Sequence, residues 1–199
     1  MRIGLISDTR VRRGEDVPQE VVQALKGVDL ILHVGGINTS EVLDWLEQIA
    51  PVKAVGRRLF SGNEREGERG RGGAELENDT RVAGQQILQL EGHTIGVVNN
   101  LELDGFNDDI LPGVIEAHRL PDGSVPMLVE EFFGTPVEIV VFGRTLYAMV
   151  EEHQGVLFIN PGSPTLPMNL RKLGNVAILH LTQESHEARI IDLAKHLVI

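Results

Sequence analysis

The sequence predicts an α/β fold in which short buried strands alternate with amphipathic helices. Three short apolar runs occupy the first sixty residues, and the first is near-continuous, as expected of a strand that is buried on both faces. Segments with a helical spacing of apolar residues separate these runs. Because strands separated by helices of this length form βαβ units, a parallel sheet follows. We place its strands at residues 2–6, 30–34 and 52–55.

End signals define the two helices between these strands. Asp16 is the expected N-cap of the first helix, with Gln19 at the capping-box spacing and Gly27 at the C-terminal stop. Ser40 is the expected cap of the second helix, which we predict to continue through Ile49. Each helix carries an apolar stripe that would pack against the sheet.

The second half of the chain contains more strands and one further helix. Residues 86–90 and 94–98 flank the sequence Glu-Gly-His at 91–93, which predicts a hairpin. A helix is expected over residues 124–133, where it would end at Gly134. Further strands are predicted at 137–142, 146–150 and 156–159, followed by a terminal hairpin of 176–181 with 188–193.

Two segments interrupt this pattern and are interpreted as insertions. Residues 57–81 hold six arginines and six acidic residues, with several glycines and little apolar content. We interpret them as a mobile surface loop, and their balanced charge argues against an RNA-binding arm. Residues 103–122 are interpreted as a second insertion with one short helix. Apart from these segments, residues 1–199 are expected to form a single domain.

Composition excludes several classes of function. The formal net charge of −11 argues against general binding to nucleic acid or to anionic membranes, because both require basic surfaces. No apolar run approaches the length of a membrane span. The absence of cysteine excludes disulfides and thiolate metal sites. Since no apolar leader is visible at its start, the protein is expected to be cytoplasmic.

Four polar motifs follow expected strands. They are Ser-Asp-Thr-Arg at 7–10, His-Val-Gly-Gly-Ile at 33–37, Phe-Gly-Arg-Thr-Leu at 142–146 and Phe-Ile-Asn-Pro-Gly-Ser-Pro at 158–164. In this order and spacing, the chain resembles the calcineurin-like metallophosphoesterase superfamily from its first residue to about Asp192. Within that superfamily it is similar to the small branch of bacterial and archaeal phosphodiesterases, which includes the phosphoesterase-like subunit of retromer.

The resemblance implies a four-layer α/β/β/α sandwich, in which two mixed sheets lie face to face with helices outside. It also implies where a metal centre would lie. Active members carry Asp-x-His, Gly-Asp, Gly-Asn, His-Gly and Gly-His-Thr-His motifs, which hold two divalent metals that activate water and clamp a phosphoryl group. Carried over position by position, the seven ligands fall on Asp8, Arg10, Gly36, Arg57 or Arg58, Asn99, Arg144 and Leu146.

Of these seven ligands only Asp8 is retained, and Asn99 is at best a weak oxygen donor. Arg10 and Arg144 replace histidines, and a guanidinium cannot bind a cation because it stays protonated. Gly36 replaces the aspartate that bridges both metals in the family. Divalent metals need several carboxylate or imidazole contacts each. The site is therefore interpreted as degenerate, and no metal cofactor is expected.

The substitutions keep positive charge at the strand ends. We hypothesise that guanidinium groups occupy the space of the metals and pair with Asp8. One interpretation is a structural ion-pair cluster that neutralises a buried carboxylate. The other is an anion pocket, in which Arg10, Arg144 and Asn99 bind a phosphate-like ligand without cleaving it. The sequence is compatible with both.

The resemblance and the substitutions together favour a non-catalytic phosphoesterase-family protein that acts as a ligand-binding or protein-interaction module. The alternative is a metal-dependent phosphodiesterase or phosphatase with atypical ligands, such as Asp8, Asn99, Asp108 or Asp109. A third hypothesis is a purely structural subunit whose surface carries partner contacts. The expected partners are a phosphate-like anion and a protein, and neither nucleic acid nor a membrane. His33 is interpreted as a packed core histidine rather than a ligand.

Overall fold

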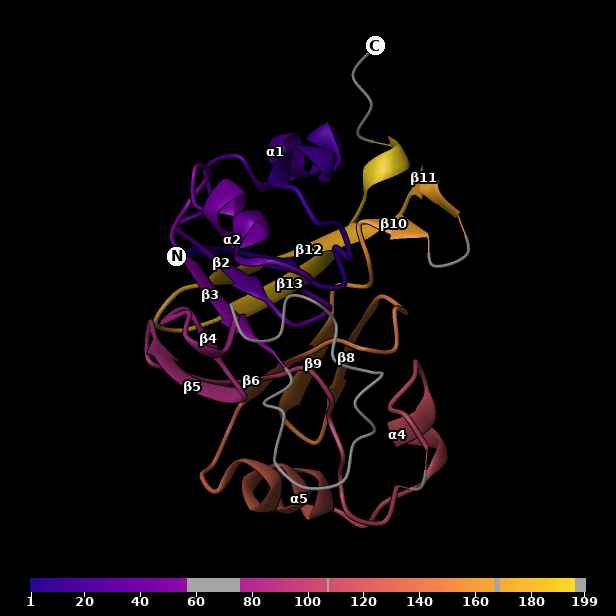
Figure 1. Ribbon diagram of the computed structural model, residues 1–199. Helices are drawn as coiled ribbons and strands as arrows, with labels where there is room; N and C mark the ends of the chain where they lie inside the picture. Colours follow the sequence, from indigo (N-terminus) through magenta and orange to yellow (C-terminus); the bar gives the residue numbers. More distant parts are fainter. Residues whose placement is uncertain (57–75, 107, 167–168, 196–199) are drawn as a thin grey trace.

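Two stacked mixed sheets form the centre of the fold, with helices on their outer faces (Figure 1). The computed structural model describes residues 1–56, 76–106, 108–166 and 169–195. Helices α1, Gln19–Leu25, and α2, Ser40–Leu46, pack on the first sheet. Helix α5, Ser124–Phe133, packs on the second sheet together with the short helix α4, Val114–Ala117.

The first sheet contains the strands predicted as βαβ units. Its order is β13-β12-β1-β2-β3-β4, in which β1 to β4 are parallel and the terminal hairpin adds antiparallel strands beside β1. β1 and β2 are almost wholly buried, as their apolar runs predict. The strands are β1 (Arg2–Ile6), β2 (Leu30–His33), β3 (Val52–Val55), β4 (Val82–Ala83), β12 (Asn175–Leu181) and β13 (His186–Asp192).

The second sheet has the order β5-β6-β7-β9-β8. Its central strands β6, β7 and β9 are parallel, while β5 and β8 pair antiparallel at the two edges. A small ladder of β10 with β11 lies outside both sheets. The elements are β5 (Gln85–Leu90), β6 (His93–Val98), β7 (Ile139–Phe142), β8 (Met149–His153), β9 (Val156–Asn160), β10 (Thr165–Leu166) and β11 (Asn169–Leu173), with 3-10 turns η1 (Gly14–Asp16) and η2 (Leu193–Lys195).

Three apolar layers hold these elements together. Successive strand residues point to opposite faces, so the neighbours Leu5 and Ile6 enter different layers. Ile6 packs in a cluster with Leu43 of α2, and Leu5 packs between the sheets in a cluster with Val141. A third cluster lies between the second sheet and α5, where Val129 is fully buried. The predicted four-layer α/β/β/α arrangement is confirmed.

The hairpin of β5 and β6 and the boundaries of α5 are confirmed. Glu91 and Gly92 both have positive φ, 51° and 88°, as a two-residue hairpin turn requires. His93 was expected in that turn, but it begins β6, opposite Leu90, and is buried. The last residue of α5 is Phe133. The next residue, Gly134, has a φ of 74°, the left-handed conformation that ends a helix.

The predicted cap of α1 is wrong. Asp16 lies in η1, before the cap position Pro18, and its carboxylate accepts hydrogen bonds from Arg13 at 3.1 and 3.3 Å instead. α1 therefore begins at Gln19 without a side-chain cap. The cap position of α2 is Thr39 rather than Ser40, and α2 ends at Leu46 instead of Ile49. The Thr39 hydroxyl donates instead to the carbonyl of Arg12, at 2.6 Å.

The two predicted insertions are described in part. Residues 57–75 lie outside the described residues, and so do the expectations placed on them, including Arg57 and Arg58. At the end of that segment, Arg81 forms ion pairs with Asp79 and with Asp44 and Glu47 around α2. The described part of 103–122 contains one short helix, α4, as predicted. Within the described residues, no helix is long and apolar enough to cross a membrane.

Candidate functional site at the strand ends

The carboxyl ends of strands from both sheets meet at one edge of the sandwich. The segment after β1 contacts the segment after β9, because the Ser163 hydroxyl donates to the Asp8 carbonyl at 3.1 Å. The segment after β6 contacts the end of β2, because Asn99 Nδ2 donates to the Val34 carbonyl at 2.8 Å. The sheet pairing therefore brings the four sequence motifs together, although they are separated by up to about 150 residues.

Asp8 is the buried carboxylate at the centre of this edge, with a side chain that is 3% exposed. Its Oδ2 accepts a hydrogen bond from the Ser7 hydroxyl at 2.7 Å. Its Oδ1 accepts two from Arg10, from Nε at 3.1 Å and from Nη2 at 2.9 Å. The pairing of Arg10 with Asp8 that the sequence predicts is thus present. A charge-assisted bond of this kind satisfies the carboxylate without a metal ion.

Gly36 packs directly against Asp8. Its φ is 69°, in the region that glycine adopts without strain. A Cβ atom built on Gly36 would lie 2.6 Å from Asp8 Cα and 2.8 Å from Asp8 Cγ. Gly35 is equally tight, because a Cβ there would overlap the side chain of Asn99. The position that the resemblance assigns to a bridging aspartate is therefore filled by neighbouring atoms.

Arg144 contacts different residues from those predicted. Its Nη1 donates to Asn100 Oδ1 at 2.7 Å and lies 3.2 Å from Asp109 Oδ1. Its side chain is 51% exposed, and no hydrogen bond or ion pair joins it to Asp8 or Arg10 in the part of the chain that the structure describes. The predicted pairing with Asp8 is wrong for this arginine. Its carboxylate partner lies in the segment 103–122, whose position could not be deduced from the motifs.

The backbone at these positions has an unusual conformation that the sequence did not predict. Seven non-glycine residues among those described have positive φ, and four of them are Asp8, Arg10, Arg144 and Leu146. Such conformations cost energy and concentrate at functional sites. Left-handed residues at 144 and 146 also explain why β8 begins at Met149 rather than at residue 146 as predicted. Of these residues only Asp8 could have suggested a positive φ from the sequence, since aspartate adopts the left-handed region more readily than arginine or leucine does.

Asn160 and the turn after β9 connect two of the segments at this edge. Asn160 Nδ2 donates to the Gly143 carbonyl at 3.1 Å and to Thr145 Oγ1 at 2.9 Å. Its Oδ1 accepts from the backbone N–H of Gly162 at 3.0 Å. The segment after β7 is thereby fixed to the segment after β9.

His33 is a core histidine, as predicted. It is fully buried at the end of β2, and its Nε2 lies 3.1 Å from Thr9 Oγ1. Burial penalises the imidazolium and lowers the pKa of His33 from 6.5 to about 3. The ring is therefore neutral at physiological pH.

The described donors at this edge do not match what two divalent cations need. Such sites use several carboxylate or imidazole contacts for each metal. Here Asp8 is engaged by Arg10, Asp109 by Arg144, and the Asn99 amide N–H by a backbone carbonyl. Among the residues that the structure describes, no group of three or more His, Cys, Asp or Glu could hold a metal ion. Arg57 and Arg58, one of which the resemblance assigns to a ligand position, lie outside the described residues.

Comparison with known proteins gives a consistent set of relatives. The family profile of the calcineurin-like phosphoesterase superfamily domain matches residues 1–184. A probable metallophosphoesterase from Methanothermobacter thermautotrophicus is 24% identical over 192 residues, which are 96% of this chain and 92% of the relative. Another probable metallophosphoesterase, from Methanocaldococcus jannaschii, is 29% identical over 168 residues, 84% of this chain and 70% of the relative.

A solved structure has the same fold. Wild-type Vps29 from Entamoeba histolytica, crystallised in complex with zinc, superposes with a TM-score of 0.59 and 17% identity. The superposition covers 97% of this chain and 99% of that one. At this identity the likeness establishes the architecture, and the zinc belongs to the neighbour.

Proposed function

This chain belongs to the calcineurin-like phosphoesterase superfamily, and from that premise we propose that it binds a partner without performing two-metal hydrolysis. It is then a non-catalytic phosphoesterase-family protein that acts as a ligand-binding or protein-interaction module. The expected cytoplasmic location is part of the same proposal.

The observation that carries this proposal is the pairing of Asp8 with Arg10. A metal at this position would have to displace a guanidinium that donates two hydrogen bonds to Asp8 Oδ1. It would also lack a bridging ligand, because Gly36 has no side chain and no room for one. Two-metal phosphoryl chemistry depends on that bridge and on several further anionic or imidazole ligands.

Two forms of the proposal make different predictions for anions. In the structural form, Arg10 and Arg144 are occupied by their carboxylates, and phosphate adds nothing. In the anion-binding form, both half-exposed arginines turn toward a shared phosphate. The observed pairs support the structural form, because each arginine already has a separate anionic partner. A titration of phosphate monitored by the NMR signals of the two guanidinium groups separates the two forms.

The alternative function is metal-dependent phosphodiester hydrolysis with atypical ligands. The names of the two archaeal relatives favour it, since both are described as probable metallophosphoesterases. Asp108 and Asp109 would then supply oxygen ligands beside Asp8 and Asn99, which requires Arg144 to release Asp109.

One experiment separates binding from hydrolysis. Turnover of bis(p-nitrophenyl) phosphate is measured with millimolar manganese for the wild-type protein and for Asp8→Asn, alongside the manganese content after gel filtration. We expect no metal retention and no turnover above that of Asp8→Asn. Turnover that needs manganese and disappears in Asp8→Asn would establish the alternative instead.

A further inference from the structure

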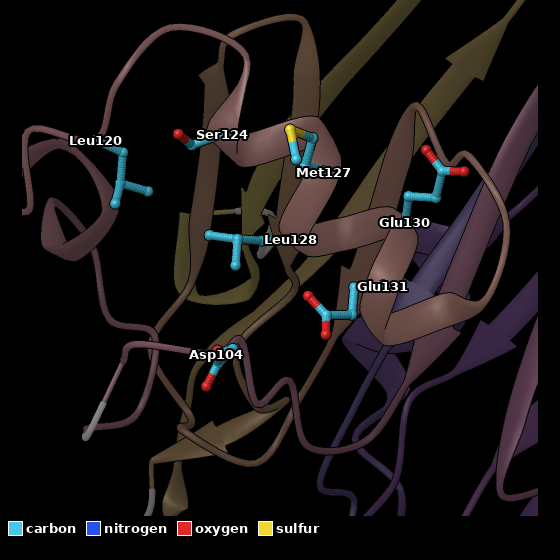
Figure 2. A pocket seen from close by; sticks show the side chains of 7 residues that line it. All are labelled: Asp104, Leu120, Ser124, Met127, Leu128, Glu130 and Glu131. Atoms are coloured by element: carbon cyan, nitrogen blue, oxygen red, sulfur yellow. The ribbon is translucent and has the colours of Figure 1, made fainter.

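A hollow of about 550 Å³ lies against α5, apart from the strand-end site (Figure 2). None of its lining residues belongs to the motifs around Asp8. Its walls come from α5 and from the 103–122 insertion that packs beside this helix. The lining residues are Asp104, Leu120, Ser124, Met127, Leu128, Glu130 and Glu131.

Apolar side chains line the inner part of this hollow. Leu120 and Leu128 are partly buried against the cluster beneath α5, and Figure 2 shows them on facing walls. Met127 is 71% exposed, which makes it one of the few large apolar side chains on the described surface. A flexible methionine beside an apolar hollow can adapt to ligands of different shape. These three side chains therefore offer an apolar contact that nothing in the chain covers within the described residues.

Three carboxylates line one side of the hollow (Figure 2). Asp104, Glu130 and Glu131 are exposed, and no ion pair joins any of them to an arginine or lysine among the described residues. Residues 101–134 contain eight acidic residues and one arginine, a net charge of −7 in a chain whose total is −11. This segment is acidic because it holds one basic residue for 8 of the 29 acidic residues of the chain. Such a field attracts cationic partners and repels anionic ones.

We propose that this hollow binds a basic amphipathic segment of a partner protein. One apolar side chain of the segment would enter between Leu120 and Leu128, and flanking lysines or arginines would reach Glu130, Glu131 and Asp104. The volume lies within the range of about 300–1,000 Å³ that is common for binding pockets. Complementary charge at the rim sets partner choice and association rate, while the apolar contact supplies affinity.

The arrangement fits a peptide segment better than a small cation. The carboxylates are exposed, whereas Leu120 and Leu128 are partly buried, so a ligand must span both environments to contact both kinds of side chain. A chain that spaces its charges on either side of an apolar side chain does reach both. This inference rests on the interaction role proposed above and names the chemistry of the partner. Its test does not involve manganese turnover, so its failure can be distinguished from a failure of the proposed function.

The test uses selection of short random peptides displayed on phage against the wild-type protein. Selected peptides are then titrated by fluorescence anisotropy against the wild type, Glu130→Gln/Glu131→Gln and Met127→Ser. The matched control is Glu184→Gln/Glu187→Gln, which removes the same charge from exposed positions at the β12–β13 hairpin. All of these side chains are exposed, so the fold should be retained, which circular dichroism checks.

We expect selected peptides to combine lysine or arginine with leucine, methionine or an aromatic residue. The double glutamine variant and Met127→Ser should each weaken binding by about tenfold or more, and the control by less than about twofold. Asp104→Asn gives an independent second measurement at the rim. Equal weakening by the control would show general charge attraction and overturn the proposal. So would selected peptides without basic residues, the absence of saturable binding, or tight binding of a small quaternary ammonium probe in place of peptides.

Discussion

Gly36 lies so close to Asp8 that the two residues exclude any side chain between them. Gly36 contacts both the backbone and the side chain of Asp8. The atoms nearest to a Cβ built on Gly36 are Oδ1, Cα and Cγ of Asp8. Two backbone hydrogen bonds join the segment after β1 to the segment after β2. The Asp8 N–H donates to the Gly35 carbonyl at 2.7 Å, and the Arg10 N–H donates to the Gly36 carbonyl at 3.1 Å. The segments after β1 and β2 therefore form one tightly packed unit at the strand ends.

This packing predicts a large effect of a single methyl group. Gly36→Ala should lower the free energy of unfolding by about 3 kcal/mol or more, from left-handed strain plus overlap with Asp8. Gly134→Ala is the matched control: its φ of 74° is similar to that of Gly36, and no atom lies within 4 Å of its Cβ position. That control should cost only about 1 kcal/mol. Urea unfolding measures both, and equal costs would mean that the overlap is absent.

The ion pair of Arg10 with Asp8 is expected to stabilise the fold. Arg10→Ala leaves a buried carboxylate with the Ser7 hydroxyl as its remaining side-chain donor, which should cost about 2 kcal/mol after allowance for the half-exposed guanidinium. In Asp8→Asn the same arginine substitution should cost clearly less. Arg13→Ala, whose pairs with Glu15 and Asp16 are exposed, should change stability little. A double-mutant cycle without coupling between positions 8 and 10 would contradict the expectation.

The left-handed backbone at Arg144 predicts an unusual benefit of glycine. Arg144 has a φ of 64°, and its exposed ion pair with Asp109 contributes little to stability. Arg144→Gly relieves the strain, whereas Arg144→Ala loses the same contacts and keeps it. The glycine variant should therefore be more stable than the alanine variant by about 1 kcal/mol in thermal or urea unfolding. An alanine variant of equal stability would show that the site is not strained.

Burial of His33 predicts a loss of stability in mild acid. The pKa of His33 is about 3 in the folded protein and 6.5 in the unfolded chain. Between these two pH values only the unfolded chain binds the proton. Stability due to this group is thus complete above pH 6.5 and falls as the pH decreases towards 3. At pH 5 the loss should be about 2 kcal/mol relative to pH 7.

Substitution isolates that contribution. His33→Gln removes the titration, so the difference in unfolding free energy between pH 7 and pH 5 should shrink by about 2 kcal/mol. The exposed His180 provides the control, and His180→Gln should leave the difference as it is in the wild type. If His33→Gln also leaves it unchanged, the buried ring is not the group that excludes the proton.

Much of the fold could be predicted because burial leaves a direct pattern in the sequence. The apolar runs around Leu5 and Leu32 define β1 and β2, and Gly134 defines the end of α5. The caps were harder, because Asp16 has a second partner, Arg13, that competes for its carboxylate. The β10–β11 ladder was missed, since β10 has only two residues and no alternation to detect.

The side-chain pairs of the site could be predicted only where the two partners are close in sequence. Asp8 and Arg10 are two residues apart, and their pairing followed from the motif. Asp109 lies far from Arg144 in the sequence, so charge alone could not say which carboxylate Arg144 would reach. Positive φ at Leu146 has no signature in the side chain, because leucine does not prefer that conformation. Tertiary packing imposes it.

Arg81 has a practical consequence for engineering. It is 16% exposed and anchors the start of β4 to α2 through Asp44 and Glu47, while β3 pairs with β4 from the other side. The start of β4 is thus fixed by contacts that do not involve residues 57–75. An epitope or a fluorescent protein inserted between Val55 and Arg81 should therefore leave the sandwich folded, which makes this interval suitable for reporters.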